Sequence, residues 1–168
     1  YQFASDGTLA IQINRRDYGQ IKINGAAELD GNLNVIATKK RAYKNGETFD
    51  ILTANNIVNE FSTFDLPSPK LLRKFELHYM ENPDRVQVEA HTKKYTTVAK
   101  NRVEGIIANY LDRIQPLVND DLSEVLGEIQ NLSESEEFST AFSSLSPMSY
   151  NNYTRGTLFA AQQYAKSL

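Results

Sequence analysis

The spacing of apolar residues along the chain changes close to Val98. Before Val98, apolar and polar residues alternate in short runs that Asn-Gly and Asp-Gly turn dipeptides separate, and this alternation predicts β-strands. After Val98, apolar residues recur three and four positions apart, which predicts amphipathic helices. We therefore expect two segregated parts, β then α, over residues 1–97 and 98–168.

The β part begins with three alternating runs whose first apolar residues, Leu9, Ile21 and Leu33, are twelve positions apart. Many short strands joined by tight turns fit a sandwich, a barrel or a β-helix. The regular spacing favours stacked rungs at the start of the chain, although three steps are few for a repeat. Open sheet edges in such a structure need a cover.

The helical part predicts a small bundle of four short helices. Asp120 is the expected N-cap of the second helix, and Ser133 and Glu136 have the spacing of a capping box before the third. Ser146 followed by Pro147 has the pattern of an N-cap with proline in the first turn of the fourth helix.

Composition narrows the possible functions. The chain has no cysteine, which excludes disulfides, thiolate nucleophiles and sulfur-ligated metals. A formal net charge of −3 argues against nucleic acid as a partner, because no surplus of basic side chains is present. No stretch approaches the ~20 apolar residues of a membrane span. Because the sequence starts at Tyr1 without a signal peptide, we interpret it as a piece of a longer protein.

The two histidines, His78 and His91, are the candidate bases or imidazole ligands at neutral pH. Each falls on the polar phase of an alternating run, so we expect solvent-facing strand histidines. A zinc site at these positions would need carboxylates from elsewhere in the chain. The carboxylate pairs Asp120-Asp121 and Glu136-Glu137 fall at expected helix N-termini, where capping is favoured over acid–base catalysis. We expect no catalytic residue, no cofactor and no metal.

Two further groups of residues could form a binding surface. The basic run Lys39-Lys40-Arg41 could bind an anionic lipid or polysaccharide, but we interpret it as a loop. Four tyrosines fall at strand ends or in loops, where a ring can cover an apolar core and keep its hydroxyl in water. A sugar-binding surface uses the same chemistry, and these tyrosines are Tyr18, Tyr43, Tyr79 and Tyr95.

The colinear order of several segments resembles the C-terminal passenger region of bacterial autotransporters, the proteins of type V secretion. The matching segments are residues 7–13, 21–35, 43–54 and 57–61, then the Val-x-Val strand at Val86 and Val88, and finally the Leu-Ser-Pro-x-x-Tyr motif at Leu145, Ser146, Pro147 and Tyr150. Each motif alone is weak, and their order over nearly the whole chain carries the resemblance.

The resemblance implies a fold and a cellular setting. The fold is a short right-handed parallel β-helix with a β cap (residues 1–97), followed by an α-helical junction segment (residues 98–168). Passenger repeats precede such a region and an outer-membrane β-barrel follows it, at the surface of a Gram-negative bacterium. The implied stacking core is Leu9, Ile11, Ile13, Ile21, Ile23, Leu33 and Val35, and the implied cap is Phe49, Ile51, Phe61 and Phe75.

The leading functional hypothesis is therefore a non-enzymatic, autochaperone-like module that templates folding and secretion of an upstream passenger. Folding of the emerging chain onto a template edge would favour export without nucleotide fuel. An alternative is a surface adhesin that binds a host or matrix glycan through exposed tyrosines. The third reading, a fragment of a glycan-cleaving enzyme, is the least favoured because the sequence offers no convergent acid pair.

Overall fold

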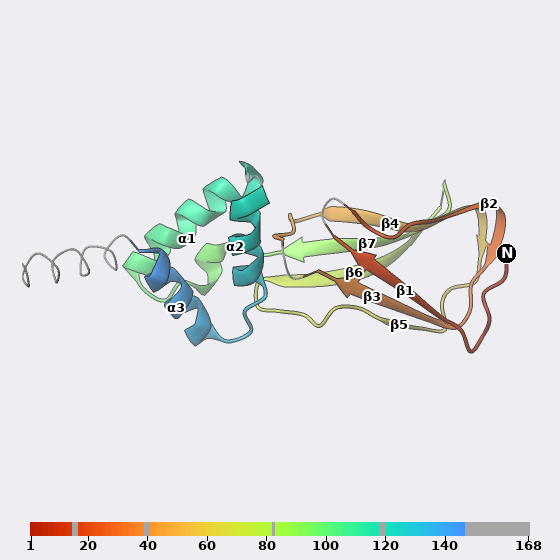
Figure 1. Ribbon diagram of the computed structural model, residues 1–168, viewed down its shortest axis with the longest axis horizontal. Helices are drawn as coiled ribbons and strands as arrows, with labels where there is room; N and C mark the ends of the chain where they lie inside the picture. The colour runs from red at the N-terminus through yellow and green to blue at the C-terminus, as the bar shows by residue number, and fades with distance from the viewer. Residues whose placement is uncertain (15–16, 39–40, 82, 118–119, 147–168) are drawn as a thin grey trace, which may run out of the picture.

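Seven strands come before three α-helices in the described residues. The computed structural model describes residues 1–168 except 15–16, 39–40, 82, 118–119 and 147–168 (Figure 1). The strands are β1 (Thr8–Ile13), β2 (Ile21–Glu28), β3 (Asn32–Ala37), β4 (Glu47–Val58), β5 (Thr63–Asp65), β6 (Arg73–Met80) and β7 (Arg85–Thr92). The helices are α1 (Arg102–Ile114), α2 (Asp120–Gln130) and α3 (Ser135–Leu145), with short 3₁₀ turns η1 (Tyr95–Val98) and η2 (Gln115–Leu117).

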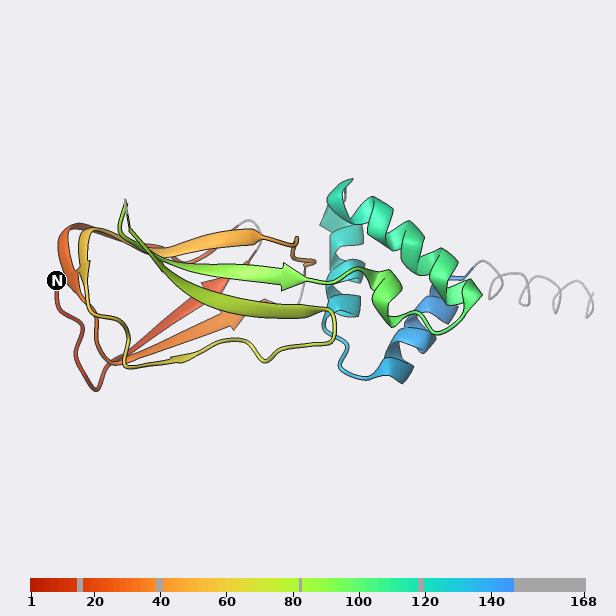
Figure 2. The same ribbon diagram turned by 180° about the vertical axis from the view of Figure 1, so that it is seen from behind.

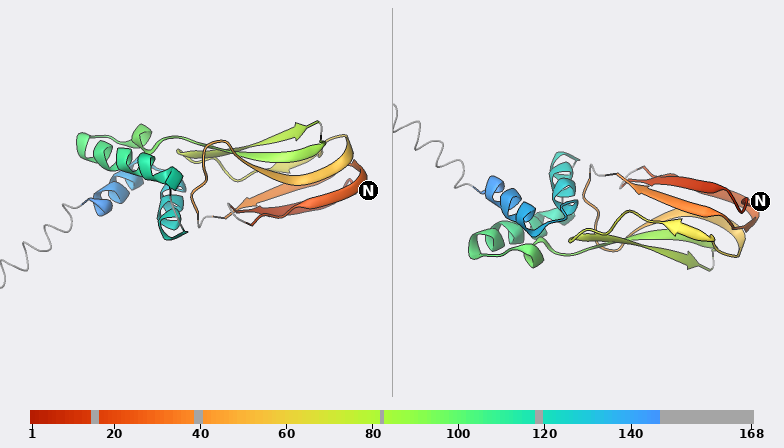
Figure 3. Two further views of the ribbon diagram at one scale, coloured as in Figure 1. Left: turned by 90° about the horizontal axis from the view of Figure 1, so that it is seen from above. Right: turned by 90° about the horizontal axis from the view of Figure 1, so that it is seen from below.

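The strands form two separate sheets. The first sheet has the order β1-β3-β5 and is parallel throughout. The second has the order β2-β4-β7-β6 and is mixed, because β2 and β4 are parallel whereas β7 is antiparallel to both of its neighbours. Together with the helices they make a mixed α/β structure, and Figure 3 shows the two sheets as facing layers.

The expected parallel β-helix with a β cap is wrong. Leu9 pairs with Leu33, whereas Ile21 lies in the other sheet and pairs with Leu52, so the twelve-residue spacing is not the step between neighbouring strands. The strands β6 and β7 form an antiparallel hairpin, because the few residues between them are too short for a parallel crossover. The chain therefore builds two distinct sheets rather than a closed coil.

The apolar faces of the two sheets enclose one core. Alternation works as expected within each strand: in β1, Ile11 and Ile13 are buried while Ala10 and Gln12 are exposed. Every residue expected in the stacking core or the cap lies in this cluster. Ile11, Ile13, Leu33, Val35, Phe49, Ile51, Phe61 and Phe75 are buried, and Leu9, Ile21 and Ile23 are partly buried against them.

The helices form a second core at one end of the sheets. Figures 1 and 2 show the helices beyond one end of the strands and the N-terminus at the opposite end. The second cluster combines helical residues such as Leu111, Leu126 and Phe138 with Leu72, which precedes β6, and Tyr95, which follows β7. The expected fourth helix after Ser146 falls outside the described residues.

Tyr43 joins the two cores. Its buried ring packs edge-on against Phe49 and Phe75, and its hydroxyl donates toward the carbonyl oxygen of Ile13 at 3.1 Å. The buried amide of Gln130 in α2 accepts from Tyr43 N–H at 2.9 Å and donates to the Tyr43 carbonyl at 3.0 Å. This amide pairs with the Tyr43 backbone as a neighbouring strand would, so α2 is held against the sheets by a specific contact.

Helix α2 also approaches the chain before Tyr43 very closely. A Cβ atom at Gly127 would stand 2.5 Å from the backbone carbonyl carbon of Arg41. Ala42 N–H donates to the carbonyl oxygen of Ser123 at 2.9 Å on the same side of the helix. A glycine at position 127 is what allows these two backbones to touch.

Candidate functional site

The outer edge of β1 presents backbone groups that the described strands do not pair. The Gly7 carbonyl accepts from Asn32 N–H at 2.8 Å and the Ile13 carbonyl from Thr38 N–H at 3.1 Å, so odd-numbered residues face β3. Because successive strand residues direct their backbone groups to opposite edges, Thr8, Ala10 and Gln12 face outward. The outward carbonyl of Gln12 accepts from Gly19 N–H at 2.9 Å. No described strand other than β3 pairs with β1, so the outward backbone groups of Thr8 and Ala10 meet no neighbouring strand.

The outer edge of β2 already carries the start of an added strand. The amino group of Tyr1 donates to the Ala26 carbonyl at 2.7 Å, and Glu28 N–H donates to the Tyr1 carbonyl at 2.8 Å. Phe3 N–H then donates to the Glu28 carbonyl at 3.0 Å, and the pairing is parallel. Residues 1–3 thus form a short parallel ladder on β2.

The first residues are also fixed by a side chain. The ring of Phe3 packs edge-on against Phe61, with 5.7 Å between ring centroids, and lies against the core between the sheets. A register shift with Gly25 at φ 156° separates this ladder from the first half of β2. On the N-terminal side of that bulge, at residues 21–23, no described strand pairs with the outer edge of β2.

The opposite edge of the first sheet, strand β5, differs from the β1 and β2 edges. The edge strand β5 has three residues, and Pro67 and Pro69 follow it closely. Short strands and prolines are the usual means of preventing strand addition at an edge. The strands β1 and β2 have six and eight residues, with no proline in either. The β1 and β2 edges are therefore better suited to pairing than the β5 edge, and β6 at the far edge of the second sheet likewise has eight residues and no proline.

The structure brings His78 and His91 together on the outer face of the β6–β7 hairpin. His91 Nε2 lies 3.1 Å from a carboxylate oxygen of Glu76, and His78 Nε2 lies 3.4 Å from one of Glu89. Sequence reasoning missed both glutamates. The signal was present, because each strand carries the same Glu-x-His triplet, and the antiparallel register places Glu76 opposite Glu89.

The other carboxylate pairs have separate positions. Glu137 Oε2 accepts from the N–H groups of Ser133 and Glu134 at 2.8 and 2.9 Å, and these bonds hold the pKa of its carboxyl below the ordinary value. The capping box thus lies one residue later than the Ser133–Glu136 pair that we expected. Glu136 instead forms an ion pair with Lys100 at 2.6 Å. The side chains of Asp120-Asp121 fall outside the described residues.

The four tyrosines do not form a common exposed surface. Tyr43 and Tyr95 are fully buried, and burial raises the pKa of both phenols. Tyr79 is partly buried and its hydroxyl accepts from Phe61 N–H at 3.1 Å. Tyr18 is 37% exposed and packs edge-on against Phe49. These positions fit the covering of an apolar core.

Several of the remaining predicted positions lie outside the described residues. Lys39 and Lys40 of the basic run do so, and the neighbouring Arg41 passes close to α2. Of the Leu-Ser-Pro-x-x-Tyr motif, Leu145 ends α3 with its side chain exposed, and Ser146 is the buried C-cap. The structure gives no placement for Pro147 and Tyr150.

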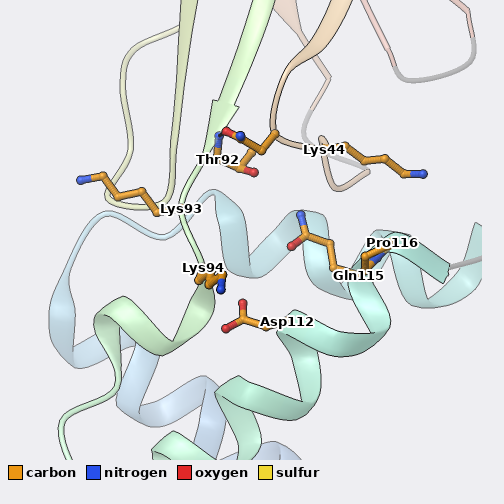
Figure 4. Close-up of a pocket in the computed structure, with 8 residues that line it drawn as sticks. Lys44, Thr92, Lys93, Lys94, Asp112, Gln115 and Pro116 are labelled. Carbon is orange, nitrogen blue, oxygen red and sulfur yellow. Dashed lines mark hydrogen bonds between the residues drawn. The ribbon is translucent and has the colours of Figure 1, made fainter.

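A cavity of about 340 Å³ lies where the sheets meet the helices (Figure 4). Its lining includes Lys44, Lys93 and Lys94 around Asp112 and Gln115. The carboxylate of Asp112 accepts from Tyr95 N–H at 2.6 Å and from the Thr96 hydroxyl at 2.9 Å. Gln115 donates to the Tyr43 carbonyl at 3.0 Å. These polar groups are engaged in joining the two cores, and Figure 4 shows Lys44 and Lys93 extending away from one another.

In the part of the chain that the structure describes, no helix is both long and apolar enough to cross a membrane. No protein-family model matches the chain, and no curated protein matches it. The resemblance to autotransporter passengers consequently receives no support from these comparisons.

Proposed function

We propose that this chain is a non-enzymatic folding module whose free edges on β1 and β2 accept parallel strands from a preceding segment of the same polypeptide. The observation that carries the proposal is the ladder of residues 1–3 on β2. A peptide N–H in place of the Tyr1 amino group would make the same bond to Ala26. A preceding segment would then continue along the outer edge of β2 toward Ile21.

Strand addition has a clear physical gain. Each residue of an added strand satisfies backbone groups at the edge, and its inward side chains extend the core between the sheets. The preformed sheets provide the template, so the preceding segment does not bear the cost of nucleating its own sheet. In the setting that the resemblance implies, the module stands at the end of a passenger exported to the bacterial surface, and this gain favours export.

The test uses a polypeptide in which a preceding segment is joined to Tyr1. Ala10→Pro removes an outward N–H of β1 and leaves the bonds to β3 in place, since proline is tolerated on the free side of an edge strand. Phe64→Pro is the matched control, because Thr63 N–H donates to Gly31 and the N–H of Phe64 faces the opposite, outer edge of the same sheet.

The measurement is the resistance of the preceding segment to added protease after refolding. We expect the wild type and Phe64→Pro to protect the segment, and Ala10→Pro to leave it open to cleavage. Equal protection in all three polypeptides would contradict strand addition at β1. Far-UV circular dichroism of each variant shows whether the sheets themselves have formed.

A further inference from the structure

The outer face of the β6–β7 hairpin carries two carboxylates and two imidazoles in a tight group. Phe75, Val88 and Ala90 are buried, so the alternating residues Glu76, His78, Glu89 and His91 point to the other face of the sheet. Glu76 is directly opposite Glu89 in the register. Two negative charges that face each other across a pair of strands destabilise the pairing of those strands unless a positive charge lies between them.

The imidazole nitrogens are aimed at this pair of carboxylates. His91 Nε2 lies 3.1 Å from Glu76 Oε2 and 3.7 Å from Glu89 Oε1. His78 Nε2 lies 3.4 Å from Glu89 Oε2. Both Nε2 atoms are shielded from solvent, and neither makes a hydrogen bond in the part of the chain that the structure describes. Because neither Nε2 atom is engaged in a hydrogen bond with a described residue, both are available to another ligand.

We propose that Glu76, His78 and His91, with Glu89 beside them, form a binding site for a divalent transition-metal ion, with Zn²⁺ as the best match. The ligand atoms of the first three all lie within 4.8 Å of one another. Ligands at zinc distances of about 2.0–2.2 Å in a tetrahedral site are about 3.3 Å apart, so small rotations of these partly exposed side chains would bring the ligand atoms to that separation.

The choice of metal follows from the ligand chemistry. Imidazole and carboxylate ligands without a thiolate suit zinc and its first-row neighbours, whereas magnesium and calcium prefer oxygen ligands alone. Lys74 Nζ forms an ion pair with Glu76 Oε1 at 2.5 Å, and the other carboxylate oxygen, Oε2, faces His91 Nε2 at 3.1 Å. The ion would neutralise the facing glutamates and link two neighbouring strands.

The test is titration of the 168-residue chain with zinc chloride, followed by calorimetry and by the NMR signals of the two imidazole rings. We expect one Zn²⁺ per chain, with the signals of both histidines shifting together at the same equivalence point. His78→Gln and His91→Gln should each weaken binding at least tenfold. Magnesium chloride should produce no shift.

Glu76→Gln is compared with Glu28→Gln, which changes an exposed glutamate in the same sheet but away from the group. We expect the first to weaken zinc binding and the second to leave it unchanged, with both variants folded by circular dichroism. The proposal is wrong if zinc does not bind at millimolar concentration. It is also wrong if binding survives both histidine substitutions, since the metal would then lie elsewhere.

Discussion

Two helix glycines provide a matched pair of substitutions with opposite expected effects. Glycine in a helix interior costs roughly 0.5–1 kcal/mol relative to alanine, so Gly→Ala normally stabilises. A Cβ at Gly105 in α1 would meet no atom within 4 Å, whereas one at Gly127 in α2 would lie 2.5–2.9 Å from backbone atoms of Arg41 and Ala42. Backbone atoms cannot rotate away as the end of a side chain can.

We expect Gly105→Ala to raise the free energy of unfolding by about 0.5–1 kcal/mol. Gly127→Ala should lower it by about 1–2 kcal/mol, because an overpacking cost of roughly 1–3 kcal/mol outweighs the gain in helix propensity. The helix must move away, which also weakens the bonds between Gln130 and Tyr43. Urea-induced unfolding followed by circular dichroism measures both variants. A Gly127→Ala protein as stable as Gly105→Ala would refute the close approach of α2 to residues 41–42.

Three further substitutions test the junction and the pH dependence of stability. Gln130→Leu should cost about 1–3 kcal/mol in urea unfolding, because it leaves the buried N–H of Tyr43 without its acceptor, and an unchanged midpoint would contradict this. Burial raises the pKa of the Tyr95 phenol, so the stability that this neutral phenol contributes is complete below about pH 10 and is lost as the pH rises. Tyr95→Phe should therefore flatten the alkaline decline of the urea midpoint. An equally steep decline in the variant would contradict this assignment. The pKa of Glu137 is shifted in the opposite direction, downward, so the stability that its carboxylate contributes is present above about pH 5 and is lost in acid. Glu137→Gln should therefore lose less stability than the wild type between about pH 5 and pH 3. A parallel loss in the two proteins would show that this cap does not make stability depend on pH.

Local pattern identified most strand regions and their buried faces, but the Asn24-Gly25 dipeptide that we expected to form a turn lies inside β2, at a bulge. The alternation of Leu9, Ile11 and Ile13 identifies the side of β1 that faces the core, because side chains alternate between the two faces of any strand. The pairing partners could not be obtained in this way. Ile21 joins Leu52, thirty-one positions away, and this choice depends on how two whole sheets pack rather than on a short period.

The candidate sites show the same division between local and long-range information. The twin Glu-x-His triplets are visible in the sequence, but only an antiparallel register with Glu76 opposite Glu89 brings the two histidines to one group. The shift of the capping box from Glu136 to Glu137 is smaller, and it follows from the N–H groups of Ser133 and Glu134 that Glu137 reaches. An edge strand is likewise defined by the neighbours that it lacks, which no local pattern reports.

Amide hydrogen exchange on the polypeptide with and without a segment joined before Tyr1 examines the free edges residue by residue. The amides of Ala10 and Ala26 face outward, whereas those of Ile11 and Ala27 face the neighbouring strand and act as internal controls. We predict that joining the segment slows exchange at Ala10 and Ala26 and leaves the two control amides as slow as before. Unchanged rapid exchange at both outward amides would contradict strand addition as the role of this module.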